Sequence, residues 1–333
     1  MCDYLWLTPI SPQALNVLSQ HSAVGAVYDS FERLPTPKCH PGTYEAVQAR
    51  IFDWMKKDDH HRIFWLSGGP GVGKTALAQT IAERCAQEWR LAASFFFYRG
   101  KVDRSDGRQF FSTVAFQLTK SIPSLSSAIL KVLGADPTIL YQSNDNQLQK
   151  LIICPLYHVG PLSTSMVIVV DALDECADGA LLCEIISLLA EALNDFRIPL
   201  QLFLTSRPEP YICDAFESIK IKTKVHSLSL DEPDTFHSIR VYLEHGFHDI
   251  FDSWWPQSGT LPDALVRLVN GSFIYAFTTL RFIDNAYDNG SPTDRLTTVL
   301  NLRAGINPLY ERILSACNYD SHTETLIGTI ILL

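Results

Sequence analysis

One eight-residue segment limits what this chain can fold into more than any other. It consists of Gly68, Gly69, Pro70, Gly71, Val72, Gly73, Lys74 and Thr75, and it matches the pattern GxxxxGK[ST]. The apolar run 63–67 before it predicts a buried strand. The residues from Thr75 onward predict a helix with an apolar stripe at Leu77, Ile81, Cys85 and Trp89. A glycine-rich loop between a strand and a helix is typical of phosphate binding, and an ordinary glycine turn is the alternative.

Each part of this segment has an expected chemical role. Glycines let consecutive backbone N–H groups converge on phosphate oxygens at a helix N-terminus, where the peptide dipoles favour negative charge. Lys74 would add a positive charge at the β and γ phosphates, and the Thr75 hydroxyl would ligate Mg²⁺. The segment therefore predicts a nucleotide-binding protein.

A second apolar run ends in carboxylates. Residues 166–170 predict a strand that is buried on both faces and leads into Asp171, the acid expected on the Mg²⁺ side of the phosphates. Asp174 and Glu175 follow closely, and either could polarise an attacking water. The alternative is that these acids cap a helix predicted over residues 179–193.

A third apolar run, residues 200–204, leads into Thr205, Ser206, Arg207 and Pro208. If this strand lies between the strands that carry the phosphate loop and Asp171, its end lies beside the γ phosphate. Arg207 is then a candidate γ-phosphate sensor. The alternative is a surface arginine before a proline turn.

These motifs together resemble the NACHT class of signal-transduction NTPases. More narrowly, several segments are similar to the fungal proteins grouped with the nephrocystin-3-like N-terminal domain, or to that family's helical segment. They are residues 38–43, 51–54, 62–66, 271–276 and 309–314. The likeness covers about residues 36–333.

The resemblance implies an α/β fold in which helices flank a five-stranded parallel sheet, with the phosphate-loop strand central, followed by an α-helical lobe. It also implies a nucleotide-dependent switch, with an adenine and ribose pocket near residues 40–43. Tyr44 departs from the family pattern, which commonly has arginine at this position. Family members often continue into WD, ankyrin or tetratricopeptide repeats, through which protein partners would be bound.

Along the chain we expect an N-terminal tail and linker over residues 1–37 with a helix at 12–20, a P-loop NTPase domain over 38–230 and a helical lobe over 231–333, beginning at a cap at Asp231. An alternation of strands with helices favours a parallel sheet. The predicted strands are residues 63–67, 92–97, 166–170, 200–204 and 219–228.

The last residues, 326–333, form an apolar run that no polar turn closes. We therefore expect the natural protein to continue beyond them, and this chain to self-associate without that continuation.

Composition excludes some partners. The net charge of −9 and the lack of a Lys/Arg cluster argue against nucleic-acid and anionic-membrane binding. The eight cysteines form no CxxC pair, the N-terminus has no signal-peptide pattern, and no apolar run is long enough to span a membrane. We expect a soluble cytoplasmic protein with reduced thiols.

Three functions fit these features. The first is a signalling switch that cycles between ATP and ADP with Mg²⁺, hydrolyses slowly, and changes shape or oligomeric state. ATP is preferred over GTP because the asparagine-lysine-x-aspartate motif that reads guanine is absent. The second is a nucleotide-stabilised scaffold without hydrolysis. The third is a small-molecule kinase, against which the long helical lobe and the lack of a readable acceptor motif argue.

Overall fold

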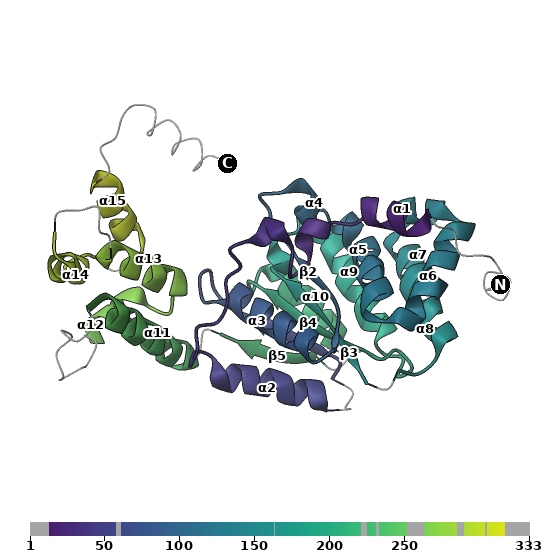
Figure 1. Ribbon diagram of the computed structural model, residues 1–333. Coiled ribbons are helices and arrows are strands. Elements are labelled where there is room, and N and C mark those ends of the chain that lie inside the picture. The colour runs from purple at the N-terminus through teal and green to yellow at the C-terminus, as the bar shows by residue number, and fades with distance from the viewer. Residues whose placement is uncertain are drawn as a thin grey trace. The chain divides into compact units, whose positions relative to one another are not determined.

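The computed structural model describes residues 13–57, 61–162, 164–220, 225–230, 233–251, 263–284, 290–303 and 305–316 (Figure 1). The chain forms two compact units, each assembled from separate segments. The first lies within Met1–Cys39, Glu45–Gly69 and Lys74–Leu230, and the second within His40–Tyr44, Pro70–Gly73 and Asp231–Leu333. The three-domain division expected from the sequence stays a prediction.

The first unit contains a five-stranded sheet in which every pairing is parallel. The order is β2-β3-β4-β1-β5, which confirms the predicted sheet and places β4 between β1 and β3. The expectation that the phosphate-loop strand β1 is central was wrong. In the described sheet, β5 alone lies outside β1, so the central strand is β4. The strands are β1 (Ile63–Ser67), β2 (Leu91–Phe96), β3 (Met166–Asp171), β4 (Leu200–Ser206) and β5 (Val225–Ser229).

Both faces of this sheet are buried by helices. Side chains alternate along a strand, so two neighbouring aromatic residues of β1 point to opposite faces. The Phe64 ring lies 5.3 Å from that of Trp54 on α2 (Glu45–Lys56), and the Trp65 ring stacks 4.3 Å from that of Phe216 on α10 (Pro210–Lys220). Two-sided burial explains why the strand is apolar at successive positions.

The helix after the phosphate loop, α3 (Lys74–Gln87), packs on β2, β3 and β4. Its Leu77, Ile81 and Cys85 are buried, as the stripe predicts. Trp89 does not belong to that stripe, because the helix ends at Gln87. The Trp89 backbone is left-handed, with φ 57°, and its side chain is 89% exposed.

The other helices of the first unit surround these elements. They are α1 (Ala14–Gln20), α4 (Val102–Ser105), α5 (Phe110–Ser121), α6 (Pro123–Ala135), α7 (Asn144–Leu148), α8 (Cys154–Val159) and α9 (Gly179–Ala192).

The start of the last strand differs from the prediction. Residues 219 and 220 belong to α10, and β5 begins only at Val225. Ile212 and Phe216, four residues apart, are both fully buried. This four-residue spacing is that of a helix, and α10 continues to Lys220, into the stretch that had been predicted as a strand.

The edge strand β2 is covered by side chains of α5. Gln117 accepts a hydrogen bond from the Ser94 N–H at 2.9 Å, and its Nε2 donates one to the Ser94 carbonyl at 2.8 Å. The Ser121 hydroxyl donates to the Ala92 carbonyl at 2.6 Å. These side chains take the place that a further strand would occupy, and so they protect the sheet edge.

The second unit is helical, which confirms the expected helical lobe. Its core includes Leu243, Phe247, Leu265, Ile283 and Leu309, all buried. The cap expected at Asp231 and the apolar run 326–333 lie outside the described residues. Its helices are α11 (Pro233–Phe251), α12 (Asp263–Val269), α13 (Phe273–Ile283), α14 (Pro292–Leu300) and α15 (Asn307–Ala316).

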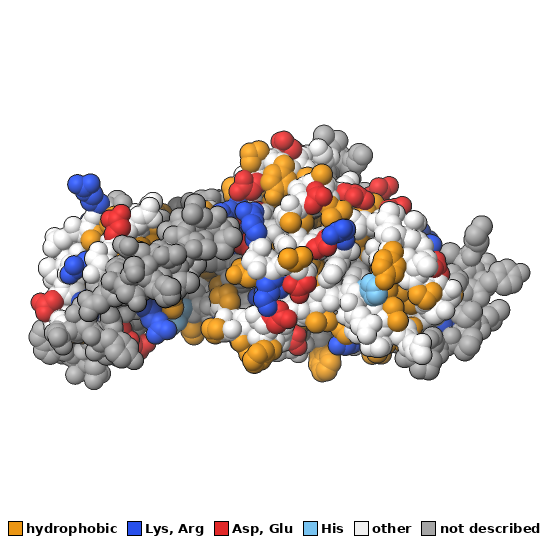
Figure 2. Space-filling view, turned by 90° about the horizontal axis from the view of Figure 1, so that it is seen from above, with side chains coloured by type: hydrophobic (Ala, Val, Ile, Leu, Met, Phe, Trp, Pro, Cys, Tyr) orange, Lys and Arg blue, Asp and Glu red, His pale blue; other side chains and the backbone are white. Residues whose placement is uncertain are grey.

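Charged side chains of both signs are interspersed on the face shown in Figure 2. In the first unit, Lys38 pairs with Glu83 at 2.9 Å and Lys101 with Glu32 at 2.7 Å. No wide basic area is visible among the described residues on that face.

The described cysteines are free thiols: Cys39, Cys85, Cys154, Cys176, Cys183 and Cys213. Burial raises the pKa of Cys39 to about 11 and that of Cys85 to about 12. Both thiols are therefore protonated and unreactive near neutral pH.

Candidate functional site: a phosphate loop and its acidic neighbours

The predicted phosphate loop lies at the turn from β1 to α3. Gly71 and Gly73 have φ of 75° and 96°, values that other residues adopt rarely. The Lys74 ammonium donates to the carbonyl oxygens of Gly68 and Gly69, at 2.7 Å each. The lysine side chain thus folds back over the start of its own loop, where a phosphate would be bound.

Asp171, the last residue of β3, is close to Thr75. Its Oδ1 accepts a hydrogen bond from the Thr205 hydroxyl of β4 at 2.6 Å, and Thr205 in turn accepts one from the Ala172 N–H at 3.1 Å. Asp171 is only 2% exposed, and burial raises the pKa of its carboxyl. Hydrogen bonds from Thr205 and Thr75, with the charges of Arg33 and Lys74, oppose this rise.

A magnesium ion fits these residues. Mg²⁺ prefers oxygen ligands and usually takes one or two from the protein, with water and phosphate completing the octahedron. The Thr75 hydroxyl and the Asp171 carboxylate are hydrogen-bonded neighbours, and a cation would offset the cost of burying the Asp171 charge. Among the described residues there is no group of three His, Cys, Asp or Glu side chains that could hold a metal by itself.

Asp174 and Arg207 are paired. The two Asp174 oxygens face Arg207: Oδ1 accepts from the Arg207 N–H at 2.8 Å, and Oδ2 lies 3.2 Å from the guanidinium Nε. Asp174 is buried, whereas the Arg207 side chain is 48% exposed. Arg207 therefore stands at the end of β4, with one part of its guanidinium bound and the rest accessible.

Glu175 has a different neighbour. Its Oε2 accepts a hydrogen bond from the Arg99 N–H at 3.0 Å, and within the described segments its Oε1 accepts none. The alternative that Asp174 and Glu175 cap the next helix was wrong. Asp178 caps α9, because its side chain accepts from the N–H groups of Ala180 and Leu181.

One neighbour of the site was missed by sequence reasoning. Arg33, in the segment expected to be a linker, lies with its guanidinium 3.5 Å from the centre of the Phe96 ring and donates to Gln79 Oε1 at 2.6 Å. Phe96 lies opposite Asp171, in the neighbouring strand β2. Burial lowers the pKa of Arg33 to about 10, and the Asp171 charge opposes this. A single arginine in the expected linker gave no signal in the sequence.

The stretch expected near the adenine and ribose lies in the second unit. His40 packs edge-on against Tyr242 and His245 of α11, with ring centroids 5.6 Å and 4.7 Å apart. The Thr43 hydroxyl donates to the His40 carbonyl at 2.6 Å. The base pocket proposed here stays a prediction.

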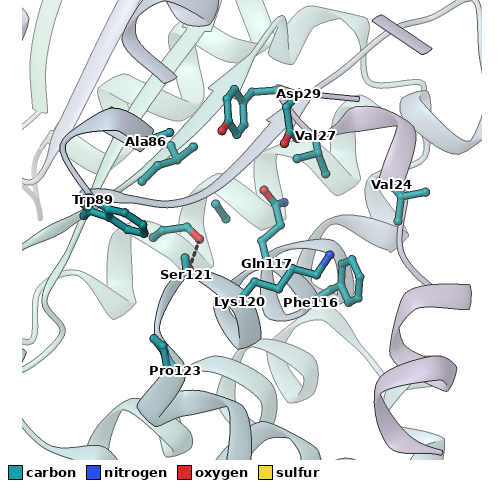
Figure 3. A pocket seen from close by; sticks show the side chains of 14 residues that line it. Val24, Val27, Asp29, Ala86, Trp89, Phe116, Gln117, Lys120, Ser121 and Pro123 are labelled. Atoms are coloured by element: carbon teal, nitrogen blue, oxygen red, sulfur yellow. Dashed lines mark hydrogen bonds between the residues drawn. The ribbon is translucent and has the colours of Figure 1, made fainter. Parts of the chain in front are cut away.

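A pocket of about 570 Å³ lies elsewhere in the first unit, against the edge strand β2 (Figure 3). Trp89, Phe116 and Pro123 contribute apolar walls, and Asp29 and Lys120 contribute charges. The Lys120 ammonium lies 4.1 Å from the centre of the Phe116 ring. None of the phosphate-loop residues lines this pocket, so it is separate from the candidate nucleotide site.

The strand order, the loop between β1 and α3, and the acid at the end of β3 define a P-loop NTPase fold. Residues 45–207 match the family model described as "Nephrocystin 3, N-terminal". This match confirms the narrower resemblance noted in the sequence, over the part of the chain that it covers.

Among solved structures, the chain is similar to domain III of the replication initiation protein DnaA from Thermotoga maritima, at 12% identity and a TM-score of 0.38, covering 88% of this chain and 100% of that one. It is also similar to PCH-2 of C. elegans, at 13% identity and a TM-score of 0.38, covering 90% of this chain and 73% of that one. Likenesses this distant carry no argument about function. A search among curated proteins found no match.

Within the described parts of the chain, every helix is too short or too polar to cross a bilayer.

Proposed function

We propose that this protein is a nucleotide-dependent signalling switch of the NACHT class that prefers ATP, binds it with Mg²⁺ and hydrolyses it slowly. The observation that carries the proposal is the convergence of Lys74, Thr75 and Asp171 at the ends of neighbouring elements, with Arg207 at the end of the strand between them. The family match supports it.

Each residue has a role in this proposal. The loop N–H groups and Lys74 bind the β and γ phosphates, and Lys74 exchanges its carbonyl partners for phosphate oxygens. Thr75 and Asp171 hold Mg²⁺, which neutralises phosphate charge when bound. The exposed part of Arg207 contacts the γ phosphate. When ATP is bound, the γ phosphate therefore competes with Asp174 for the Arg207 guanidinium, whereas ADP does not.

Slow hydrolysis follows from the surroundings of the acids. Asp174 uses both oxygens to bind Arg207, so Glu175, through Oε1, is the better placed to polarise a water. The same pairing of Asp174 favours a second candidate, a nucleotide-stabilised scaffold without hydrolysis. Measuring phosphate release from ATP by the purified protein distinguishes the switch, which hydrolyses ATP, from the scaffold, which does not.

We also propose that the switch acts in the cytoplasm and signals to protein partners through repeats of the kind that follow such domains, and that its oligomeric state responds to the nucleotide. The net charge of −9 and the mixed charges on the face shown in Figure 2 argue against nucleic acid as the partner.

The test is nucleotide binding by the purified chain and by Lys74→Ala. We expect ADP or ATP to co-purify with the parent protein, and calorimetry to show ADP affinity reduced about 10-fold to 100-fold or more in the variant, because charge-assisted hydrogen bonds are worth about 1.5–3 kcal/mol each. Lys150→Ala, which changes a lysine on a different element, is the control and should bind normally. Equal affinity for parent and Lys74→Ala would contradict the proposal.

A further inference from the structure

The tip of the phosphate loop, residues 70–73, belongs to the second unit and is held there by hydrogen bonds to its carbonyl groups. The Gly71 carbonyl accepts from the N–H groups of Phe273 at 2.8 Å and Ile274 at 3.4 Å, in the first turn of α13. The Val72 carbonyl accepts from the Tyr44 hydroxyl at 2.6 Å. We propose that Tyr44 and the first turn of α13 are positioning groups that preset the phosphate-binding amides of the loop.

The physical basis is the planarity of the peptide bond. In a trans peptide, the carbonyl of one residue and the N–H of the next lie in one plane and point in opposite directions. Holding the Gly71 carbonyl from outside therefore directs the Val72 N–H inward, and holding the Val72 carbonyl directs the Gly73 N–H inward. Inward N–H groups are what a phosphate loop presents to its anion. The inference rests on the nucleotide function proposed above.

Tyr44 is itself held in an unusual conformation. Its φ of 54° is rare for a residue other than glycine, and its N–H donates to the Ser238 hydroxyl at 2.9 Å. Its ring lies 5.5 Å from that of Phe273, and its hydroxyl is also 3.3 Å from the Thr235 hydroxyl. Backbone and side chain are thus both fixed with the hydroxyl directed at the Val72 carbonyl, an arrangement typical of functional sites.

The loop glycines fit closely against the same neighbours. A Cβ at Gly71 would lie 2.7 Å from Ile274 Cγ2 and 2.9 Å from Ser272 Oγ. A Cβ at Gly73 would lie 3.3 Å from Tyr44 Cε2. At Gly71 a side chain would clash with its neighbours, and at Gly73 it would press on Tyr44; the positive φ of both positions also favours glycine.

This arrangement couples the loop to α13. The first N–H groups of a helix have no acceptor within the helix, and here the Gly71 carbonyl is the acceptor for two of them. Phosphate binding, which orders the loop, must then also order the start of α13. By linkage, loosening the start of α13 must weaken phosphate binding equally.

The first test uses two pairs of variants. Tyr44→Phe removes the hydroxyl, and Thr235→Val is its control because it removes the second partner of that hydroxyl and leaves the bond to the Val72 carbonyl. Phe273→Pro removes the ring and the N–H, whereas Phe273→Ala removes only the ring. Proline is tolerated at the first helical position, and Ser272, at φ −100° and ψ 110°, is extended as a residue before proline should be.

We expect ADP affinity to fall about threefold to tenfold in Tyr44→Phe relative to Thr235→Val, and by a similar factor in Phe273→Pro relative to Phe273→Ala. Adenosine, which has no phosphate, should bind all four proteins alike. A general loss of structure would weaken both ligands, so the difference between them identifies positioning of the loop. Equal ADP affinity within each pair would overturn the inference.

The second test needs no nucleotide. Hydrogen exchange of the free parent protein should show the Phe273 and Ile274 amides protected, unlike ordinary first-turn amides, and Tyr44→Phe should speed their exchange. Unprotected amides in the parent would overturn the inference even if ADP binds. If the parent binds no ADP but these amides are protected, the proposed function fails while the described anchoring of the loop stands.

Discussion

Two acids that are adjacent in the sequence have different electrostatic surroundings. Asp174 is buried and bound to Arg207 through both oxygens, whereas Glu175 is only partly buried and accepts one backbone hydrogen bond from Arg99. A carboxylate whose two oxygens both bind an arginine has no oxygen left to accept a proton from a water. The two residues should therefore have separable roles.

Single substitutions test this assignment. Glu175→Gln should reduce ATP hydrolysis about 10²-fold, as when a general base is lost, and leave ADP affinity nearly unchanged. Asp174→Asn keeps an oxygen for the Arg207 N–H but removes the charge beside the guanidinium, so its main effect should be on the preference for ATP over ADP. Single-turnover phosphate release and calorimetry measure the two effects. If Glu175→Gln hydrolyses as fast as the parent, Glu175 is not the base.

At the scale of elements, α5 stabilises the sheet by completing the hydrogen bonds of its edge strand. The Gln117 amide matches both backbone groups of Ser94, one as donor and one as acceptor. All of these groups are buried, so an unpaired member would be costly.

Gln117→Leu should therefore destabilise the protein by about 2–4 kcal/mol, since it leaves two buried backbone groups without partners. Urea unfolding followed by circular dichroism measures this loss. Gln87→Leu, at an exposed position near the end of α3, is the control and should change the free energy of unfolding by less than about 0.5 kcal/mol. A loss no larger than that of the control would mean that the edge is not held by Gln117.

The strands that were predicted well are those buried on both faces. Residues 63–67, 166–170 and 200–204 are predominantly apolar runs between turn signals, and such runs are readable without tertiary information. The start of β5 was predicted wrongly, because residues 219 and 220 end α10 and β5 begins only at Val225.

The phosphate loop and its acids were visible as motifs because their spacing is local. The partners of those residues were not visible. Arg33 lies far from Asp171 in the sequence, and Tyr44 is linked to Val72 only through a hydroxyl and a carbonyl. These contacts join segments that are far apart in the sequence. Periodic patterns of apolar residues, which predict single helices and strands, do not show which distant segments come together.

At the scale of the whole molecule, a switch requires the two nucleotides to be bound differently in its two states. Moving an equilibrium from 1:99 to 99:1 takes about 5.5 kcal/mol, and hydrogen bonds to charged groups supply about 1.5–3 kcal/mol each. Contacts of a γ phosphate with Lys74, Mg²⁺ and Arg207 could together reach this value. Arg207 is the residue that ADP would not engage.

Arg207→Ala should leave ADP affinity intact, lower the preference for ATP analogues over ADP, and reduce any nucleotide-dependent change in hydrodynamic radius or protease sensitivity. Arg197→Ala is the control, because Arg197 is an exposed arginine paired with Asp195 in the same unit. Identical responses of the parent and Arg207→Ala to ADP and a non-hydrolysable ATP analogue would exclude Arg207 as a sensor.

If Arg207 is the γ-phosphate sensor, the central position of β4 limits how the signal can leave the site. Hydrogen bonds join β4 to β1 on one side and to β3 on the other, and the Trp65 indole also donates to Ser206, the last residue of β4, at 2.9 Å. A strand fixed in this way cannot slide when a ligand arrives. In the proposed switch, the signal from Arg207 would leave the sheet through its pair with Asp174 and through the short connection into α10, as a shift of the turn after β3 or of that helix.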